Sequence, residues 1–342
     1  MTNIKVVGLD LAKSVFQVHG VDGSGRIVVR RKLRRGQVLA FFAELDPCLI
    51  GLEACATAHH WARSLQSLGH EVRLIPPQYV KPFVKTNKND AADAEAICEA
   101  LTRPTMRFAA VKSADRQSLL MLHRARELLV RQRTMLINAL RGHCAEFGVT
   151  AAQGMSRAQE LIALVDDGED DRLPALARRA LCSLVAQIRS IQEQISGLEK
   201  ELMVWHRSSN ESRRLEAIPG VGVITATALA ATVGDASQFG SARQFAAWLG
   251  LVPKQRSSGG KDRLGRISKR GDGYLRRLLV HGARAVLRWT RNRPERRSPW
   301  IEGLLARRPT NVVLVAMANK MARIVWAMLS RSQTYQPGRT AA

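Results

Sequence analysis

Cysteine is scarce in this chain of 342 residues, and the few cysteines present are not arranged for metal binding or cross-linking. Their number is odd and none forms a CxxC pair; they are Cys48, Cys55, Cys98, Cys144 and Cys182. Structural zinc sites and disulfide frameworks need close or paired cysteines. We therefore expect reduced, mostly buried thiols, and we exclude a zinc-binding or disulfide-stapled class.

Long apolar runs are also lacking. No run approaches the roughly 20 residues that cross a bilayer, and the N-terminus Met-Thr-Asn-Ile-Lys lacks the pattern of a signal peptide. We therefore expect a cytoplasmic protein without a membrane partner.

Acidic residues are few relative to basic ones, and the imbalance is uneven along the chain. Asp and Glu number 29 against 53 Lys and Arg, for a net charge of +24. Residues 1–112 hold 16 basic and 10 acidic side chains, 113–210 hold 13 and 12, and 211–342 hold 24 and 7. The surplus in the last third predicts a polyanion-binding surface, most simply one for nucleic acid. A membrane surface is the competing interpretation of a basic chain.

Four of the few acids stand in informative places. Asp10 and Glu53 each close an apolar run, so each is expected at the end of a buried strand. Asp90 and Asp93 are three residues apart in a helix-forming stretch, which puts them on one helical face. Carboxylates packed together repel one another unless a cation lies between them. The pattern predicts a divalent-metal site of the kind found in RNase H-type nucleases.

The first 76 residues predict an RNase H-like α/β domain. The order is three strands, then helix, strand, helix, strand, with a glycine turn at Asp22–Gly25 supporting a hairpin. The expected strands are Ile4–Asp10, Val15–Gly20, Arg26–Arg31, Cys48–Glu53 and Glu71–Ile75, with helices at Gln37–Leu45 and His59–Leu68. Some other small α/β fold is the alternative.

Heptad spacing in the middle third predicts a helical coiled-coil hairpin. The expected seams are Leu122, Ala125, Leu129, Leu136 and Ala139 within 116–147, and Leu181, Leu184, Ile188, Ile191, Ile195, Leu198, Leu202 and Trp205 within 181–205. An acidic turn at Val165–Asp171 would separate the two antiparallel helices. The hairpin could pair with a second protomer, or its helices could serve only a local core.

The last third begins with a glycine pattern. Pro219-Gly-Val-Gly222 ahead of a small-residue helix is typical of a helix-hairpin-helix, whose backbone N–H groups face a DNA phosphate. Gly220 and Gly222 are therefore candidate nucleic-acid contacts. A purely structural glycine connection is the alternative.

A basic segment, Gly250–Gly271, then precedes a predicted mainly α end of the chain, with a helix at Tyr274–Trp289. Adjacent serines Ser257 and Ser258 lie on its glycine turn, and its cations are Lys254, Arg256, Lys261, Arg263, Arg266, Lys269 and Arg270. A hydroxyl ringed by cations suits nucleophilic attack on a phosphodiester. Solvated loop serines are the alternative, and no histidine nearby in sequence could act as base.

In combination these motifs resemble the DEDD transposases of the insertion-sequence 110 family, including its 1111 branch. The resemblance runs in order from residue 4 to about 330. It is carried by Gly8-Leu-Asp10, Glu53, Lys88–Asp93, Ile218–Gly222, Gly250–Pro253, Ser258–Gly260 and Gly265–Gly271.

The resemblance implies a RuvC-like catalytic domain over 1–112 whose tetrad Asp10, Glu53, Asp90 and Asp93 binds Mg²⁺, with Mn²⁺ as a substitute. It also implies dimerisation helices over 113–210 and a transposase domain over 211–332, leaving a disordered tail at 333–342. The family's serine nucleophile falls on Ser258, with Ser257 as the fallback.

Its partners would be donor and target DNA and a noncoding guide (bridge) RNA. The resemblance implies a homo-oligomer, dimer to tetramer, in which one protomer's acids join another's serine. The location would be the bacterial cytoplasm, at the nucleoid.

Two other functional classes use the same residues differently. A Holliday-junction resolvase would use the acidic tetrad with water and leave Ser258 dispensable. A non-catalytic DNA- or RNA-binding protein would keep its function without Asp10.

Overall fold

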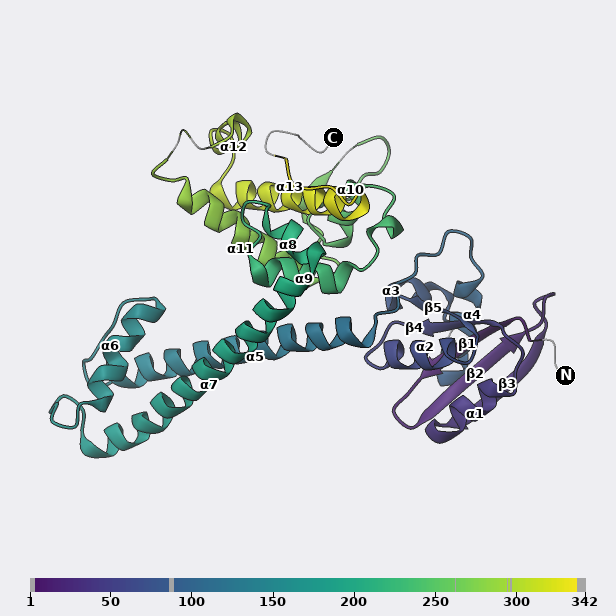
Figure 1. The fold of residues 1–342 in the computed structure, drawn as a ribbon, viewed down its shortest axis with the longest axis horizontal. Coiled ribbons are helices and arrows are strands. Elements are labelled where there is room, and N and C mark those ends of the chain that lie inside the picture. The colour runs from purple at the N-terminus through teal and green to yellow at the C-terminus, as the bar shows by residue number, and fades with distance from the viewer. Residues whose placement is uncertain (1–3, 86–88, 262, 294, 296, 337–342) are drawn as a thin grey trace. The chain divides into compact units, whose positions relative to one another are not determined.

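The structure, a computed structural model, describes residues 4–85, 89–261, 263–293, 295 and 297–336 (Figure 1). The chain forms two compact units, residues 1–115 and residues 116–342. Each unit has hydrophobic cores of its own. The predicted boundaries at 112, 210 and 332 stay predictions.

A five-stranded mixed sheet organises the first unit. Its strands are β1 (Val6–Leu11), β2 (Val15–Val21), β3 (Ile27–Arg34), β4 (Leu49–Glu53) and β5 (Glu71–Ile75), in the spatial order β3-β2-β1-β4-β5. The first three pair antiparallel, and β1, β4 and β5 pair parallel. All five predicted strands are confirmed, and the mixed α/β sheet is consistent with an RNase H-like domain.

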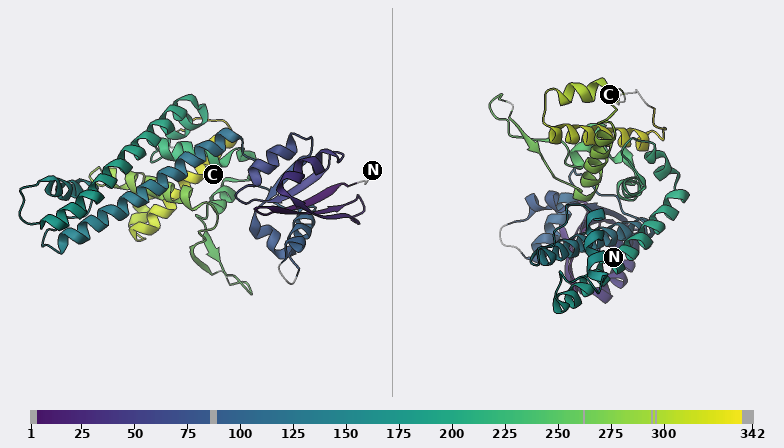
Figure 2. Two further views of the ribbon diagram at one scale, coloured as in Figure 1. Left: turned by 90° about the horizontal axis from the view of Figure 1, so that it is seen from below. Right: turned by 90° about the vertical axis from the view of Figure 1, so that its left-hand side faces the viewer.

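Helices cover both faces of this sheet (Figure 2, left). The two predicted helices are confirmed as α1 (Val38–Ala43) and α2 (Ala58–Gln66), which pack on the face that carries the largest core of the unit. The opposite face is covered by α4 (Asp90–Leu101). Short turns of helix lie between these elements: η1 (Arg35–Gln37), α3 (Pro77–Val80) and η2 (Lys81–Phe83).

Direct backbone contact sets the position of α4 on β1. A Cβ atom added at Gly8, in the middle of β1, would lie 2.1 Å from the carbonyl oxygen of Ala94 and 2.6 Å from the backbone nitrogen of Cys98. Only glycine leaves room for this approach, because any side chain would meet backbone atoms that cannot rotate away. The absence of a side chain at Gly8 therefore brings α4, and the acids on it, against the sheet.

In the part of the second unit that the structure describes, helices are accompanied by one small hairpin. Its helices are α5 (Ala114–Ala145), α6 (Met155–Asp166), α7 (Ala175–Ser208), α8 (Asn210–Glu216), α9 (Val223–Val233), η3 (Ala236–Gln238), α10 (Ala242–Trp248), α11 (Gly273–Trp289), α12 (Pro299–Leu305) and α13 (Thr310–Ser330). The hairpin consists of β6 (Pro253–Gln255) and β7 (Leu264–Ile267). The predicted helix at 274–289 is confirmed as α11.

The predicted long helices exist as α5 and α7, but the seam expected on α5 is wrong. On α7 the heptad residues Leu181, Ile188, Ile191, Ile195 and Leu202 are buried. On α5 the expected residues are only half-buried; those buried instead are Leu119, His123, Ile137, Leu140 and Cys144. The buried positions are displaced by one residue from the expected ones: Leu119 and Ile137 are 18 residues, about five turns, apart, so the cores at the two ends of α5 lie on the same face of the helix.

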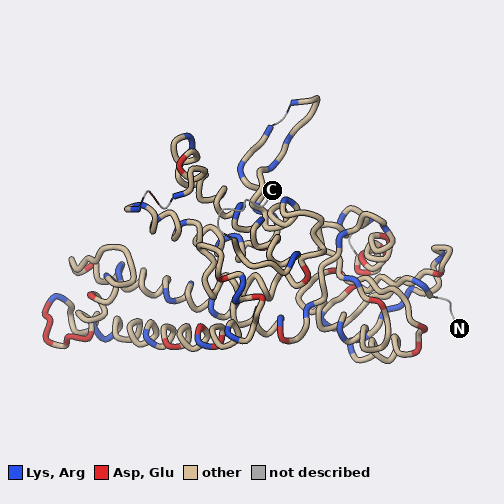
Figure 3. Tube along the Cα trace, turned by 45° about the horizontal axis from the view of Figure 1, so that its top comes forward, with Lys and Arg blue, Asp and Glu red and all other residues tan. Residues whose placement is uncertain are grey.

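The predicted two-helix hairpin contains a third helix. Residues of α6 pack between the end of α5 and the start of α7, burying Ala158, Leu161, Ile162, Leu164 and Val165. Val165 and Asp166 end this helix, so the acidic turn begins at Asp167 rather than at Val165 as predicted. The turn is the red stretch at the left end of Figure 3.

Among the described residues, one helix, α13, is long and apolar enough to cross a membrane by length and composition alone, contrary to the expectation of no such run. Its buried residues include Val313, Leu314, Met317 and Met321, which belong to the core shared with α8–α11. The buried core helix of a water-soluble protein can meet the same criterion of length and composition. Beyond α13, Tyr335 in the predicted tail packs against this core, and 337–342 lie outside the described residues.

Replacing Gly8 with alanine is expected to destabilise the first unit by about 1–3 kcal/mol, the usual cost of overpacking. The added methyl group must push α4 away from β1. Thermal unfolding checks this, with Gly36→Ala as the matched control because nothing lies within 4 Å of a Cβ there. An equal melting temperature for the two variants would contradict the proposed role of Gly8.

Candidate active site

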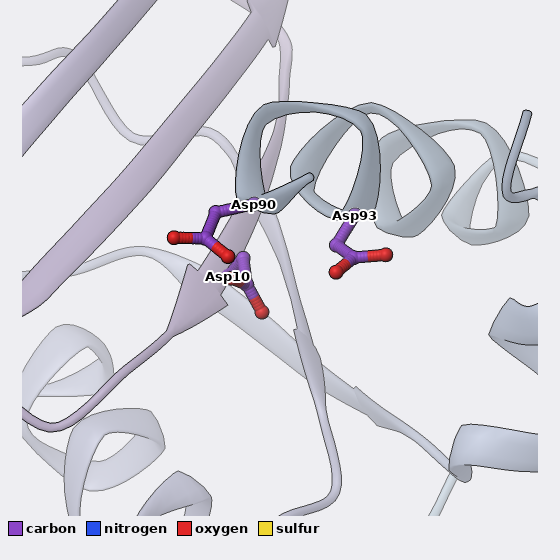
Figure 4. A group of neighbouring side chains, drawn as sticks. All are labelled: Asp10, Asp90 and Asp93. Carbon is purple, nitrogen blue, oxygen red and sulfur yellow. The ribbon is translucent and has the colours of Figure 1, made fainter. Parts of the chain in front are cut away.

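Three of the four predicted acids lie together at one end of the sheet. Asp10 is near the end of β1, and Asp90 and Asp93 are on the first turn of α4 (Figure 4). One carboxylate oxygen from each lies within 4.8 Å of the others. Asn89 fixes the start of α4, because its side chain accepts a hydrogen bond from the Ala92 amide at 2.8 Å. Lys88, which begins the predicted motif, lies outside the described residues.

Glu53, the fourth predicted acid, is the last residue of β4, which pairs with β1. Leu52 pairs with Leu9, so Glu53 follows beside Asp10 in the parallel register. It does not belong to the close group of three, but its charge contributes to raising the pKa of Asp10.

The electrostatics of Asp10 suit a candidate metal ligand. Its pKa is raised from 3.8 to about 6, first by burial and then by the charges of Asp93, Asp90 and Glu53. A hydrogen bond from the backbone of Leu11 opposes part of this shift. Carboxylate oxygens are the ligands preferred by hard divalent cations, and such a cation would offset both causes of the raised pKa. The donor set therefore fits a divalent metal.

The predicted serines lie between β6 and β7 in the second unit, at the turn of the hairpin. Ser257 Oγ accepts hydrogen bonds from Gln255 Nε2 at 3.1 Å and from the Arg263 amide at 3.3 Å, so it links the two arms. Ser258 joins the turn through its backbone, whose carbonyl accepts a bond from the Lys261 amide at 3.1 Å. Its side chain is exposed and has no hydrogen bond within the described part of the chain.

All the cations predicted to contact nucleic acid around this turn are exposed. The hairpin that carries several of them is the projecting loop at the top of Figure 3. They are Lys254, Arg256, Lys261, Arg263, Arg266, Lys269 and Arg270. The hairpin thus presents positive charge on both sides of the serines.

The two predicted helix-hairpin-helix glycines have different surroundings. Gly220 faces α11, where an added Cβ would lie 2.7 Å from the carbonyl oxygen of Gly282. Close packing, the alternative interpretation, accounts for this glycine. Gly222 is exposed, precedes α9 and has nothing within 4 Å of a Cβ position. Gly222 is therefore the member of the pair that leaves room for a phosphate.

Sequence reasoning missed polar residues that the strand register places beside the acids. Gln17 on β2 is directly opposite Asp10, and Lys32 on β3 is directly opposite Gln17. The alternation of polar and apolar residues in β2 is the one signal that pointed to this face. Without the register, nothing in the sequence connects Lys32 to Asp10.

Two models of transposase families match the chain. The family model for DEDD transposases of the IS110 type matches residues 7–147, and the model described as "Transposase IS116/IS110/IS902 family" matches residues 212–298. The first match contains the acids and the second contains the serines.

Several relatives match along nearly the whole chain. A "Probable family 20 transposase" from Pseudomonas aeruginosa is 53% identical over 98% of this chain and 100% of its own length. The transposase for insertion sequence element IS1111A from Coxiella burnetii is 43% identical over 99% and 93%, respectively. That for IS1328 from Yersinia enterocolitica is 41% identical over 98% and 99%.

Fold, acidic cluster and similarity together define the chain as a transposase, an enzyme that cuts and rejoins DNA. It belongs to the IS110/IS1111 family of insertion-sequence transposases. The acidic cluster is a candidate divalent-metal site of that family's DEDD type.

The raised pKa of Asp10 predicts how metal and pH act on stability. Because the folded-state pKa of Asp10, about 6, exceeds its ordinary value of 3.8, the metal-free protein loses stability as pH rises from about 4 to about 6. We expect Mg²⁺ to raise the melting temperature more at pH 7.5 than at pH 5.5, where protons compete for Asp10. Asp10→Asn should raise the metal-free melting temperature at pH 7.5 and abolish the Mg²⁺ effect.

The matched control is Asp46→Asn, which removes the same charge from an exposed position after α1. It should keep the full Mg²⁺ effect. A Mg²⁺ effect that persists in Asp10→Asn, or that is equal at both pH values, would argue against the assigned metal site.

Proposed function

We propose that the protein is a DNA recombinase that excises and inserts its insertion sequence by a serine-linked intermediate. Asp10, Glu53, Asp90 and Asp93 form the metal site of a RuvC-like domain, and Ser258 supplies the attacking oxygen. The observation that carries the proposal is the convergence of Asp10, Asp90 and Asp93 within 4.8 Å, in a chain that also carries an exposed serine on a cationic hairpin.

Mg²⁺, with Mn²⁺ as a substitute, is the ion that best suits an all-carboxylate donor set in a phosphoryl-transfer enzyme. When bound, it neutralises the scissile phosphate and stabilises the entering and leaving oxygens. The chain's own contribution is to hold four negative groups close together. Burial at the end of β1 and the backbone contact at Gly8 keep the acids in place against their mutual repulsion.

The reaction has two balanced transfers. Ser258 Oγ attacks the phosphorus and loses its proton while the bond from phosphorus to the leaving deoxyribose oxygen breaks, and that oxygen takes up a proton. The product is a phosphoserine ester, which conserves the number of phosphate ester bonds. A deoxyribose hydroxyl from another DNA end then attacks this ester, which restores a DNA phosphodiester and returns the proton to Ser258.

The environments of the two serines favour Ser258 as nucleophile. The hydroxyl of Ser257 is held by Gln255 and by the Arg263 amide, whereas that of Ser258 is exposed on the turn. The exposed cations Arg256 and Lys261 nearby would offset the negative charge that develops on the attacked phosphate.

Donor and target DNA are the proposed substrates, with sequence recognition delegated to a noncoding guide (bridge) RNA. The support is the family resemblance together with a C-terminal surface of exposed cations, which contact backbone phosphates without reading bases. The acids and the serine belong to different compact units. We propose a homo-oligomer, dimer to tetramer, in which one protomer's acids act with another's serine, in the bacterial cytoplasm at the nucleoid.

A covalent-adduct assay tests the proposal. Supercoiled donor plasmid is incubated with Mg²⁺, guide RNA and wild type, Asp10→Ala, Ser258→Ala or Ser257→Ala, and then resolved under denaturing conditions. We expect a covalent protein–DNA adduct and recombined product from wild type. Asp10→Ala and Ser258→Ala should lose both by at least about 100-fold, the scale on which a missing catalytic group acts, and Ser257→Ala should retain adduct formation.

Each alternative predicts a distinct result. Hydrolytic nicking without any adduct, unchanged in Ser258→Ala, would establish a water-using resolvase. An adduct formed by Ser258→Ala but not by Ser257→Ala would move the nucleophile to Ser257. Full DNA binding by Asp10→Ala with no cleavage by any protein, wild type included, would support a non-catalytic binding protein.

A further inference from the structure

A cationic depression lies beside the acidic cluster, on the sheet face that α4 partly covers. It has a volume of about 260 Å³, and its lining includes Gln17, His19, Arg30, Lys32 and Ala91. Ala91 immediately follows Asp90, so the depression reaches the start of α4 where two of the acids lie. None of the proposed catalytic steps uses these residues.

Strand register shows that Gln17, His19, Arg30 and Lys32 of this lining share one face of the sheet with Asp10, whereas Val18 and Arg31, which also line the depression, alternate to the other face. Directly opposed residues in antiparallel strands point to the same side of a sheet. Asp10 pairs with Gln17, and Gln17 pairs with Lys32. Lys32 is therefore two strand spacings, roughly 10 Å, from Asp10 along a single row.

The neighbouring row supplies the second cation. Gly8 pairs with His19, and His19 pairs with Arg30, so Arg30 lies one row from Lys32 on the same face. Arg30 Nη2 is 3.4 Å from Glu95 Oε2 on α4, and Lys85 pairs with the same carboxylate. Glu95 thus tethers Arg30 loosely at the rim, while the Arg30 side chain remains 58% exposed.

We propose that this depression binds the DNA phosphate that flanks the scissile one, through Lys32 and Arg30, with Gln17 hydrogen-bonding the intervening nucleotide. The inference rests on the proposed function, because it takes the scissile phosphate to lie at the metal site. A DNA strand entering there meets carboxylates at one phosphate and needs cations at the next. The row from Asp10 through Gln17 to Lys32 provides that change of charge.

The bound partner is DNA rather than guide RNA because the depression adjoins the acids directly, and the strand at the acids is the one that is cut. Its cations read charge and position, so they fix which phosphodiester reaches the acids without reading sequence. Lys32 and Arg30 are thus positioning residues.

The proposal is tested by replacing one DNA phosphate at a time with a neutral linkage and combining each replacement with mutation of the protein. A series of cleavable DNAs is made, each with a single methylphosphonate, a neutral linkage, at a different position on either side of the scissile bond. The rate of adduct formation on each DNA is measured in the presence of guide RNA. The proteins compared are wild type, Lys32→Gln, Arg30→Gln and Arg26→Gln. For wild type we expect one flanking position at which the neutral linkage slows the reaction about tenfold, the size of one lost charge-assisted contact. Lys32→Gln should be slow on unmodified DNA by a similar factor and should show no further loss with the neutral linkage at that position, since both changes remove one interaction.

Arg26→Gln is the matched control, because Arg26 directly precedes β3 and pairs with Asp22 at the hairpin turn. It should match wild type at every position, and Lys32→Arg should restore most of the rate. Melting temperatures of all variants exclude unfolding as the cause. The proposal would be overturned if the losses from Lys32→Gln or Arg30→Gln and from the neutral linkage were additive at every DNA position. It would also be overturned if non-additive losses appeared only when the neutral linkage was placed in the guide RNA. Failure of wild type to form an adduct on any DNA would instead reject the proposed function.

Discussion

The candidate active site depends on one close contact, that of the α4 backbone with Gly8 of β1. Strand pairing alone fixes Asp10 and Glu53, since both lie at the ends of adjacent parallel strands. It cannot fix Asp90 and Asp93, which belong to a helix that could lie at many heights above the sheet. With no Cβ at Gly8, the carbonyl of Ala94 reaches the sheet surface, and the first turn of α4 is carried to the end of β1. Buried Ile97 and Leu101 hold the helix there through the apolar core beneath it.

This packing opposes an electrostatic cost. Burial and the carboxylates of Asp90 and Asp93 raise the pKa of Asp10. The fold therefore keeps these three carboxylates close together despite their mutual repulsion. Apolar burial at Ile97 and Leu101 compensates for part of that cost. The arrangement is therefore preorganised for a cation, because the repelling groups do not have to be gathered when the cation arrives.

The second unit handles its charge in the opposite way. The cations predicted to contact nucleic acid lie on and beside an exposed hairpin of two short strands, none of whose residues belongs to the buried core formed by α8–α11 and α13. A segment with so few buried apolar contacts opens and adjusts at low cost. That suits the proposed nucleophile Ser258, which must approach phosphorus closely, whereas rigid burial suits the acids. The difference between the buried acids and the exposed serine hairpin follows from how each segment is packed.

Much of this could be predicted from local patterns, because apolar runs and their polar ends depend only on nearby residues. The five strands, the end positions of Asp10 and Glu53, and the shared face of Asp90 and Asp93 are of this kind. The register of the seam on α5 could not, because its buried face includes His123 and half-buried Arg126, whose partners Tyr274 and Glu199 lie on other helices. Helix α6 was missed for a related reason, since its apolar residues serve a core completed by distant parts of α5 and α7.

The cations of β3 show most clearly what a linear pattern cannot convey. In sequence, Arg30 and Lys32 belong to an exposed basic strand that has no visible relation to an acid more than one strand away. The relation is created by register: β2 carries the row from Asp10 to Lys32, and a shift of one residue in either pairing would turn Lys32 to the other face. The antiparallel pairing of β1, β2 and β3 thus does more than complete the sheet. It sets the distance between the acids proposed to hold the metal at the scissile phosphate and the cations proposed to contact the next phosphate.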